Sequence, residues 1–188
     1  MKTVASFIII SLDGFYEDAK GAFDWPIVDE EFRQFAIRQL DESETLGFGR
    51  ATYEHMAAWW PTDQALSNDL DIATRMNTMP KLVFSTTLQR ADWSETTVIS
   101  GEAAEQIEAI RSAPGGDLLI IGSAHLTARL VAADVLDELR IMVSPIVLGR
   151  GRSLFEDLGD RVALTLSDVR QFDSGNVLLT YRSSLHII

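Results

Sequence analysis

Glycine, arginine and hydroxyl side chains follow an apolar run in the segment LGFGRATYEH. Gly49 and Arg50 come directly after the run, and Thr52 stands where a helical pattern begins. The first turn of a helix exposes unpaired N–H groups and the positive end of its dipole, so it binds phosphate well, and an arginine can add a bidentate contact. These residues therefore predict an anion site. The open alternative is that Thr52 only caps the helix and Arg50 is a solvated surface residue.

Two further segments repeat this arrangement. Ser85 and Thr86 follow the run KLVF, and Gly122 and Ser123 follow the run DLLII before another helical pattern. Ligands of open α/β sheets lie beyond the carboxyl ends of the strands, so we expect the three segments to face one cleft. The competing explanation is that short turns between strands and helices need glycines and hydroxyls in any case.

Metal and thiol chemistry have no support in the sequence. The chain has no cysteine, and His55, His125 and His186 lie far apart without a metal-binding spacing. We therefore expect no metal site and interpret the histidines as surface or capping residues. The absence of cysteine also fits a reducing compartment, of which the cytoplasm is the simplest choice.

Acidic residues outnumber basic ones, 28 to 16, which gives a formal net charge of −12. This charge repels phosphate backbones and anionic lipid surfaces, so neither nucleic acid nor a membrane is expected as a partner. No apolar run approaches the ~20 residues that span a bilayer, and the run from Val4 to Ile10 is predicted to be a core strand rather than a signal peptide. An anionic ligand would need a local basic group.

The elements that must position these side chains can be predicted from hydrophobic periodicity. Apolar runs rich in Val, Ile and Leu alternate with stretches of helical period, which is typical of an α/β fold with a mainly parallel sheet covered on both faces. Strands are predicted at 2–10, 44–49, 81–86, 96–100, 117–122 and 138–147. Helices are predicted at 29–41, 52–59, 102–113 and 123–133.

The pattern changes after residue 160. The runs RVALTLSDVRQF and NVLLTYRS are separated by Asp173 to Asn176, a hairpin signal, so the sheet is expected to end in antiparallel strands. Residues 61–79 are the longest segment expected to be irregular and to cover the domain. With no repeat and no linker, residues 1–188 are expected to form a single domain.

Five segments, taken in order, resemble a known family: SLDGFYEDAKGAFDWP, LGFGRATYEHM, PKLVFSTTL, LLIIGSAHLTARLV and ELRIMVSPIVLGRGRSLF. Together they resemble the three-layer dihydrofolate reductase fold, in the branch similar to the reductase domain of the bifunctional riboflavin-biosynthesis deaminase/reductase. The resemblance implies a reductase that uses NADPH and passes hydride to a small heterocycle, pteridine-like or pyrimidine-like. Without cysteine, the zinc signature of the deaminase domain is absent.

The resemblance also implies which residues bind the cofactor: Gly49, Arg50, Thr52, Ser85, Thr86, Gly122 and Ser123. By motif, the first three hold the 2′-phosphate and pyrophosphate of NADPH. The two hydroxyls lie near the adenosine phosphate, and the last two residues correspond to paired glycines against the pyrophosphate. The second glycine of that pair is Ser123 here, whose Cβ restricts positive φ and close approach of a ligand.

On the substrate side, the resemblance points to three residues with open alternatives. Asp13 in SLDG either hydrogen-bonds a ligand, in a catalytic or substrate-binding role, or orders the turn before Gly14. Trp25 either walls the substrate pocket or belongs to the core. Glu30 lies nearest to the carboxylate that assists protonation in dihydrofolate reductases. Pairing with the helix dipole explains Glu30 without catalysis, and water can also supply the proton.

Two functions remain after these arguments. We prefer an NADPH-dependent reductase, because polar groups stand at three strand ends. The alternative is a non-catalytic nucleotide-binding or small-ligand-binding protein that retains the fold, which Ser123 and the lack of a clear catalytic acid would favour. Relatives commonly pair through sheet edges or C-terminal strands, so a homodimer is expected.

Overall fold

A computed structural model describes residues 2–183, and its centre is an eight-stranded sheet in the order β5-β4-β3-β6-β1-β7-β10-β9. The six parallel strands are β1 (Val4–Ser11), β3 (Thr45–Gly49), β4 (Lys81–Phe84), β5 (Thr96–Ile99), β6 (Leu118–Ile121) and β7 (Glu138–Ser144). The antiparallel strands are β9 (Leu164–Gln171) and β10 (Val177–Ser183). The predicted α/β class, the mainly parallel sheet and the C-terminal hairpin are confirmed.

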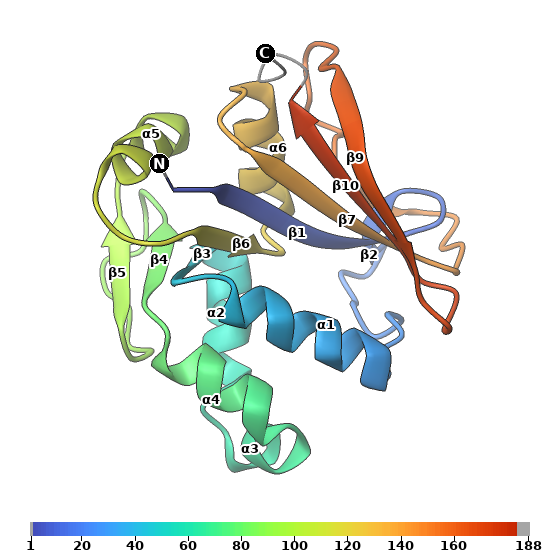
Figure 1. Ribbon diagram of the computed structural model, residues 1–188, viewed down its shortest axis with the longest axis horizontal. Helices are drawn as coiled ribbons and strands as arrows, with labels where there is room; N and C mark the ends of the chain where they lie inside the picture. The colour runs from blue at the N-terminus through green and yellow to red at the C-terminus, as the bar shows by residue number, and fades with distance from the viewer. Residues whose placement is uncertain (1, 184–188) are drawn as a thin grey trace.

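Helices cover both faces of this sheet and make three layers (Figure 1). One face carries α5 (Ala103–Ser112) and α6 (Ala124–Ala132). The other carries α1 (Glu30–Asp41), α2 (Arg50–Trp59), α3 (Asp63–Asn68) and α4 (Leu70–Thr78). Each face has its own apolar core, because the central strands send alternate side chains to opposite sides.

Residues 61–79 are not irregular as expected, because they form α3 and α4. The polar residues that suggest a loop are helix caps: the Thr62 hydroxyl accepts from the Ala65 N–H, and the Asp69 carboxylate accepts from the Ile72 N–H. Ile72 and Met76, one helical turn apart, bury the inner face of α4. The use of these polar residues as helix caps was missed.

A second, two-stranded sheet also escaped prediction. It pairs β2 (Phe15–Asp18) with β8 (Gly151–Ser153) in antiparallel fashion. Both strands are short, and their sequences FYED and GRS contain charges and a glycine, so neither shows an apolar alternation. This sheet joins the segment after β1 to the segment after β7.

None of the helices in residues 2–183 combines the length and the apolar character that crossing a bilayer would require.

Candidate functional site

Two junctions between a strand and a helix meet at one point of the sheet. One joins β3 to α2 and contains Gly49, Arg50 and Thr52, and the other joins β6 to α6 and contains Gly122 and Ser123. The two strands are parallel neighbours, so their carboxyl ends lie side by side. The Gly49 N–H donates to Ser123 Oγ at 2.9 Å, and the Ser123 N–H donates to Thr52 Oγ1 at 3.0 Å. Thr52 therefore does not cap α2, as one alternative held; its hydroxyl accepts from the other junction. The sequence predicted that the two junctions face one cleft, and in the structure they are hydrogen-bonded to each other.

Gly122 and Ser123 both adopt left-handed backbone conformations, with φ of 60° and 57°. A Cβ at Gly122 would stand 3.2 Å from Thr52 Cγ2, so this position requires glycine for both conformation and space. Ser123 takes the left-handed conformation despite its Cβ, because its hydroxyl donates to the Ile121 carbonyl at 3.1 Å and accepts from Gly49. The departure from a paired glycine thus adds a hydroxyl bridge between the two junctions.

No side chain of residues 2–183 caps the N-terminus of α2 or of α6. Gly49, the N-cap of α2, has no side chain, and Ser123, the N-cap of α6, directs its hydroxyl to Ile121 and Gly49 instead of to the first turn. Uncapped first turns keep both their donors and the positive end of the dipole for an anion. The two junctions therefore present two such helix ends next to one another.

Arg50 connects this point to the end of β4. Its Nη1 donates to Thr87 Oγ1 at 2.9 Å, and its Nε donates to Glu54 at 2.8 Å, with half of the side chain exposed. Ser85 Oγ accepts from the Thr87 and Leu88 N–H groups, which makes the turn after the strand. The structure thus brings Arg50 to the predicted hydroxyl cluster, in which Thr87 makes the contact and Thr86 is exposed.

A cavity of about 450 Å³ opens beside the junctions, and Gly122 forms part of its wall. Its floor is formed by apolar residues of β1 and β6, and its sides by α1, α2, α4 and the loop before α1. Most of the lining is apolar or aromatic: Phe7, Ile9, Phe23, Pro26, Val28, Phe32, Ala36, Leu40, Met56, Trp59, Trp60, Ala65, Ile72, Met76, Leu119 and Ile121. The arrangement suits a flat, largely apolar ring beside the predicted anion site.

The polar side chains in the wall of this cavity are Asp24, Gln39, Asn68 and Asp69. Asp69 caps α4 and accepts from Arg33 Nε at 2.7 Å. Burial opposes ionisation of Asp69, but hydrogen bonds from Arg33 and from the Ile72 N–H outweigh it and lower the pKa of the carboxyl. Asp69 therefore stays anionic and is a poor proton donor at neutral pH.

The structure places Glu30 outside the cavity. Its side chain is 70% exposed, accepts from Gln34 Nε2 at 2.7 Å and lies 3.5 Å from Arg33. The face of α1 toward the cavity carries Phe32, Ala36, Gln39 and Leu40 instead. The geometry supports the helix-dipole explanation of Glu30 and gives no support to a catalytic one.

Trp25 lies beside the cavity rather than in its wall. Its ring packs edge to face on Phe23, with ring centroids 5.3 Å apart, while its neighbours Asp24 and Pro26 line the space. The aromatic residues that sequence reasoning missed are Trp59 and Trp60 at the end of α2. The pair WW at the end of an otherwise amphipathic helix was the available signal.

Asp13 orders a turn between two loops. Its carboxylate accepts from Ser11 Oγ at 2.7 Å and from the N–H groups of Leu148 and Gly149 at 3.0 and 2.7 Å. The hydrogen bond from Ser11, followed by those from the two backbone groups, lowers the pKa of the carboxyl. The Asp13 carboxylate holds the backbone of residues 148 and 149, whereas the turn before Gly14 is closed by the Gly14 N–H, which donates to the Ser11 carbonyl. Contact of Asp13 with a ligand stays a prediction.

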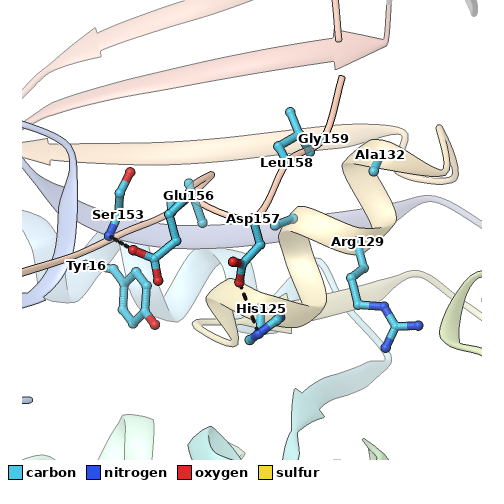
Figure 2. A pocket seen from close by; sticks show the side chains of 11 residues that line it. Tyr16, His125, Arg129, Ala132, Ser153, Glu156, Asp157, Leu158 and Gly159 are labelled. Atoms are coloured by element: carbon cyan, nitrogen blue, oxygen red, sulfur yellow. Dashed lines mark hydrogen bonds and ion pairs between the residues drawn. The ribbon is translucent and has the colours of Figure 1, made fainter. Parts of the chain in front are cut away.

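A smaller pocket of about 100 Å³ lies against α6, and Figure 2 shows its charged lining. His125 Nε2 lies 3.4 Å from Asp157 Oδ2, and both side chains are exposed, as expected for a surface histidine. His186 lies outside the described residues. Among residues 2–183, no group of three or more histidine, aspartate or glutamate side chains could hold a metal ion.

The fold is that of dihydrofolate reductase. The chain superposes on dihydrofolate reductase from Enterococcus faecalis in complex with NADP(H), with a TM-score of 0.64 at 16% identity, covering 97% of this chain and 96% of that one. A putative riboflavin biosynthesis protein from Shewanella sp. PV-4 superposes with a TM-score of 0.74 at 22% identity, covering 97% and 99% of the two chains.

Within this fold, the chain belongs to the RibD C-terminal domain family, whose model matches residues 2–178. An uncharacterized protein of Bacillus subtilis (strain 168), YyaP, is 28% identical over 176 residues, which are 93% of this chain and 91% of YyaP. The resemblance that the five sequence segments carried is thereby confirmed.

Proposed function

We propose that this protein is an NADPH-dependent reductase that transfers hydride to a small heterocyclic substrate, pteridine-like or pyrimidine-like. Membership of a reductase domain family and the fold shared with an NADP(H)-bound reductase support the proposal. The observation that carries it is the position of Gly122, which belongs both to the uncapped junction and to the wall of the apolar cavity. An anion site and a ring site are thus adjacent.

The residues of the junction fit the phosphate groups of NADPH. The free first turns of α2 and α6 would hold the pyrophosphate, and Gly122, which lies both at the junction and in the cavity wall, would mark the point where the cofactor chain enters the cavity. Arg50, Ser85 and Thr86, with Thr87, would hold the phosphate on the adenosine ribose. When bound, NADPH supplies the hydride, and the apolar wall of the cavity keeps water away from the reacting rings.

Protonation of the reduced ring needs a donor, and neither of the acids named from the sequence, Asp13 and Glu30, nor the partly buried cap Asp69 provides one. Glu30 faces solvent, Asp13 is engaged with the backbone, and Asp69 is held anionic by Arg33. We therefore assign the proton to a water molecule at the cavity mouth, and we give Asp13 a positioning role.

The test is cofactor binding followed by turnover. A ligand that binds only the native state stabilises it by about 2.7 kcal/mol at a hundredfold excess over its dissociation constant, so NADPH is expected to raise the melting temperature. Oxidised pterins and flavin precursors are then screened for loss of NADPH absorbance. Absence of any thermal shift at millimolar NADPH would remove the reductase proposal.

One observation favours the second candidate, a binding protein without turnover. The cavity face of α1 carries no carboxylate among its described residues, although the reductase resemblance implied one there. NADPH binding without turnover of any screened heterocycle would select this candidate.

We also propose a homodimer in the cytoplasm. Edge strand β9 exposes Leu166 and Val169, and exposed apolar residues on an open edge support pairing with a second copy. A chain without cysteine suits a reducing compartment. Light scattering coupled to size exclusion measures the mass, which is expected to be twice that of the 20.9 kDa chain.

A further inference from the structure

We propose that the ring that binds in the 450 Å³ cavity is neutral or cationic and carries no phosphate or carboxylate group. This inference rests on the proposed function, because it names the substrate class of the same site. It concerns the cavity alone and not the junction, where the phosphates of the cofactor are expected.

The charges in the cavity wall are all negative. Among the described residues that line it, none is lysine, arginine or histidine, whereas Asp24 and Asp69 contribute two carboxylates. The chain as a whole also carries a net charge of −12. An anionic substituent would enter a low-dielectric space with like charges and without a counterion, which is costly.

Away from the junctions, the backbone of the cavity wall offers no substitute for the missing cations, because the starts of α1 and α4 are already capped. The Asp29 carboxylate accepts from the Phe32 N–H at 2.8 Å at the start of α1. The Asp69 carboxylate accepts from the Ile72 N–H at 3.1 Å at the start of α4. Each aspartate occupies a donor and places a negative charge where a phosphate would otherwise bind.

The arginines nearest to the wall are neutralised by carboxylates. Arg33 lies 2.7 Å from Asp69, 2.6 Å from Asp71 and 3.5 Å from Glu30. It therefore balances the aspartates around it and has no charge to spare for a ligand.

Arg140 reaches the wall only through Gln39. Its Nη1 donates to Gln39 Oε1 at 3.4 Å, while its Nη2 donates to Glu138 at 2.8 Å. An uncharged amide thus separates the cavity from this guanidinium. The amide and the carboxylates can instead accept from ring N–H and amino groups, as in aminopyrimidines and pterins.

The experiment uses two matched ligand pairs that differ by one anionic group. Pterin is compared with pterin-6-carboxylate, and riboflavin with its 5′-phosphate, on the full chain saturated with NADP⁺. Binding is followed by quenching of tryptophan fluorescence, since Trp59 and Trp60 line the cavity. We expect the neutral member of a pair to bind at least about tenfold more tightly, a difference of about 1.4 kcal/mol.

A charge variant tests the cause. Asn68→Lys adds a cation to the cavity wall and is expected to strengthen binding of pterin-6-carboxylate at least about threefold while leaving pterin unchanged. Gln64→Lys changes the net charge equally from an exposed position on α3 outside the wall, and is expected to change neither ligand.

Three results would overturn the inference: tighter binding of the anionic members, equal binding within each pair, or no quenching by any of the four ligands. Failure of the proposed function is distinguishable, because it appears as an absence of NADPH binding in the separate thermal-shift measurement. Preference for the neutral members, reduced by Asn68→Lys and not by Gln64→Lys, supports the inference.

Discussion

Helix α4 differs from helices α2 and α6 in whether side chains cap its ends. The N-terminus of α4 is capped by Asp69, and Lys81 Nζ donates to the Asn77 and Met79 carbonyls at its C-terminal end. The N-termini of α2 and α6 have no side-chain cap. Capping satisfies the orphan groups of a helix within the chain, whereas an uncapped end leaves them to solvent or to a ligand.

Within one protein, the capped helix ends thus support the cavity wall, and the uncapped ends are left for binding. Around the apolar cavity, carboxylates fill the helix ends and make that wall stable and acidic. At the junctions of β3 and β6, glycine and serine fill the corresponding positions and leave the backbone accessible. The chain thus gives up local capping energy at two helices, about 1 kcal/mol each, where we propose that the cofactor binds.

The largest expected effect comes from removing the cap of α4. Asp69→Ala takes away a helix cap and leaves Arg33 without its most buried partner, so the free energy of unfolding should fall by about 2–3 kcal/mol. Urea denaturation measures this loss. Asp71→Ala is the matched control, because Asp71 also pairs with Arg33 but is 61% exposed, and it should cost less than about 1 kcal/mol. Similar losses for both variants would contradict the capping role.

The next effect concerns the proposed contact of Arg50 with the phosphate of the cofactor. Arg50→Ala should weaken NADPH binding by roughly ten- to a hundredfold and leave NADH within a few-fold, because a charge-assisted contact to the 2′-phosphate is worth about 1.5–3 kcal/mol. Lysine at this position should restore only part of the affinity for NADPH, since its ammonium cannot make the bidentate contact of a guanidinium. Calorimetric titration with both cofactors measures the difference.

Arg90→Ala is the control for this prediction. Arg90 lies on the loop after β4, which Arg50 contacts through Thr87, but it is 83% exposed and pairs with Asp92, so its loss should change the binding of neither cofactor. Equal losses for NADPH and NADH in the Arg50 variant would mean that Arg50 serves the pyrophosphate or the helix.

A smaller effect is expected from Ser123, where two substitutions separate strain from hydrogen bonding. Ser123→Ala removes the hydroxyl that bonds Gly49 and Ile121, which should cost about 1–2 kcal/mol. Ser123→Gly loses the same bonds but relieves the left-handed strain, so it should be about 1 kcal/mol more stable than the alanine variant. Thermal melts of the two variants give the ordering, and the reverse ordering would contradict the strain argument.

The last prediction is a pH dependence of stability at the other end of α4, which is spread over more than two pH units. Lys81 is 1% exposed, and burial lowers the pKa of its ammonium from 10.5 to about 8. Between these values the unfolded chain holds one more proton than the folded chain, so stability should rise with pH, by at most about 1.4 kcal/mol per unit.

Denaturation at pH 8, 9 and 10 measures this rise. Lys81→Met should remove it, because methionine does not titrate and can fill the space between Met79 and the Trp93 ring, which lies 4.6 Å from the ammonium. Persistence of the same rise in the methionine variant would assign it to another group.

The fold was largely predictable, because buried strands and amphipathic helices leave strong periodic signals. The end of β3 and the start of α6 were placed within a residue of their observed positions for this reason. The segment 61–79 was mispredicted because Thr62 and Asp69 are typical of both loops and helix caps. Only the apolar spacing of Ile72 and Met76 separates the two cases, and that signal is short.

The candidate site was predictable where it follows from topology and not where it follows from packing. Gly49 and Ser123 could be paired from sequence, because parallel neighbouring strands bring their carboxyl ends together. The cavity wall could not, because it depends on how α1 rotates about its axis and on where α4 crosses it. Glu30 and Gln39 are on the same helix, yet only the second reaches the cavity.

The hydrogen bonds from the Leu148 and Gly149 N–H groups to Asp13 make two distant stretches of sequence depend on one another. The segment SLDG supplies the accepting carboxylate, and the segment PIVLGRG supplies the two donating N–H groups. Gly149, one of the two donors, has a positive φ of 75° in its turn. When parts are exchanged among members of this family, the two stretches should be transplanted as a pair. A chimera that takes one without the other would join a carboxylate to a loop not shaped to meet it.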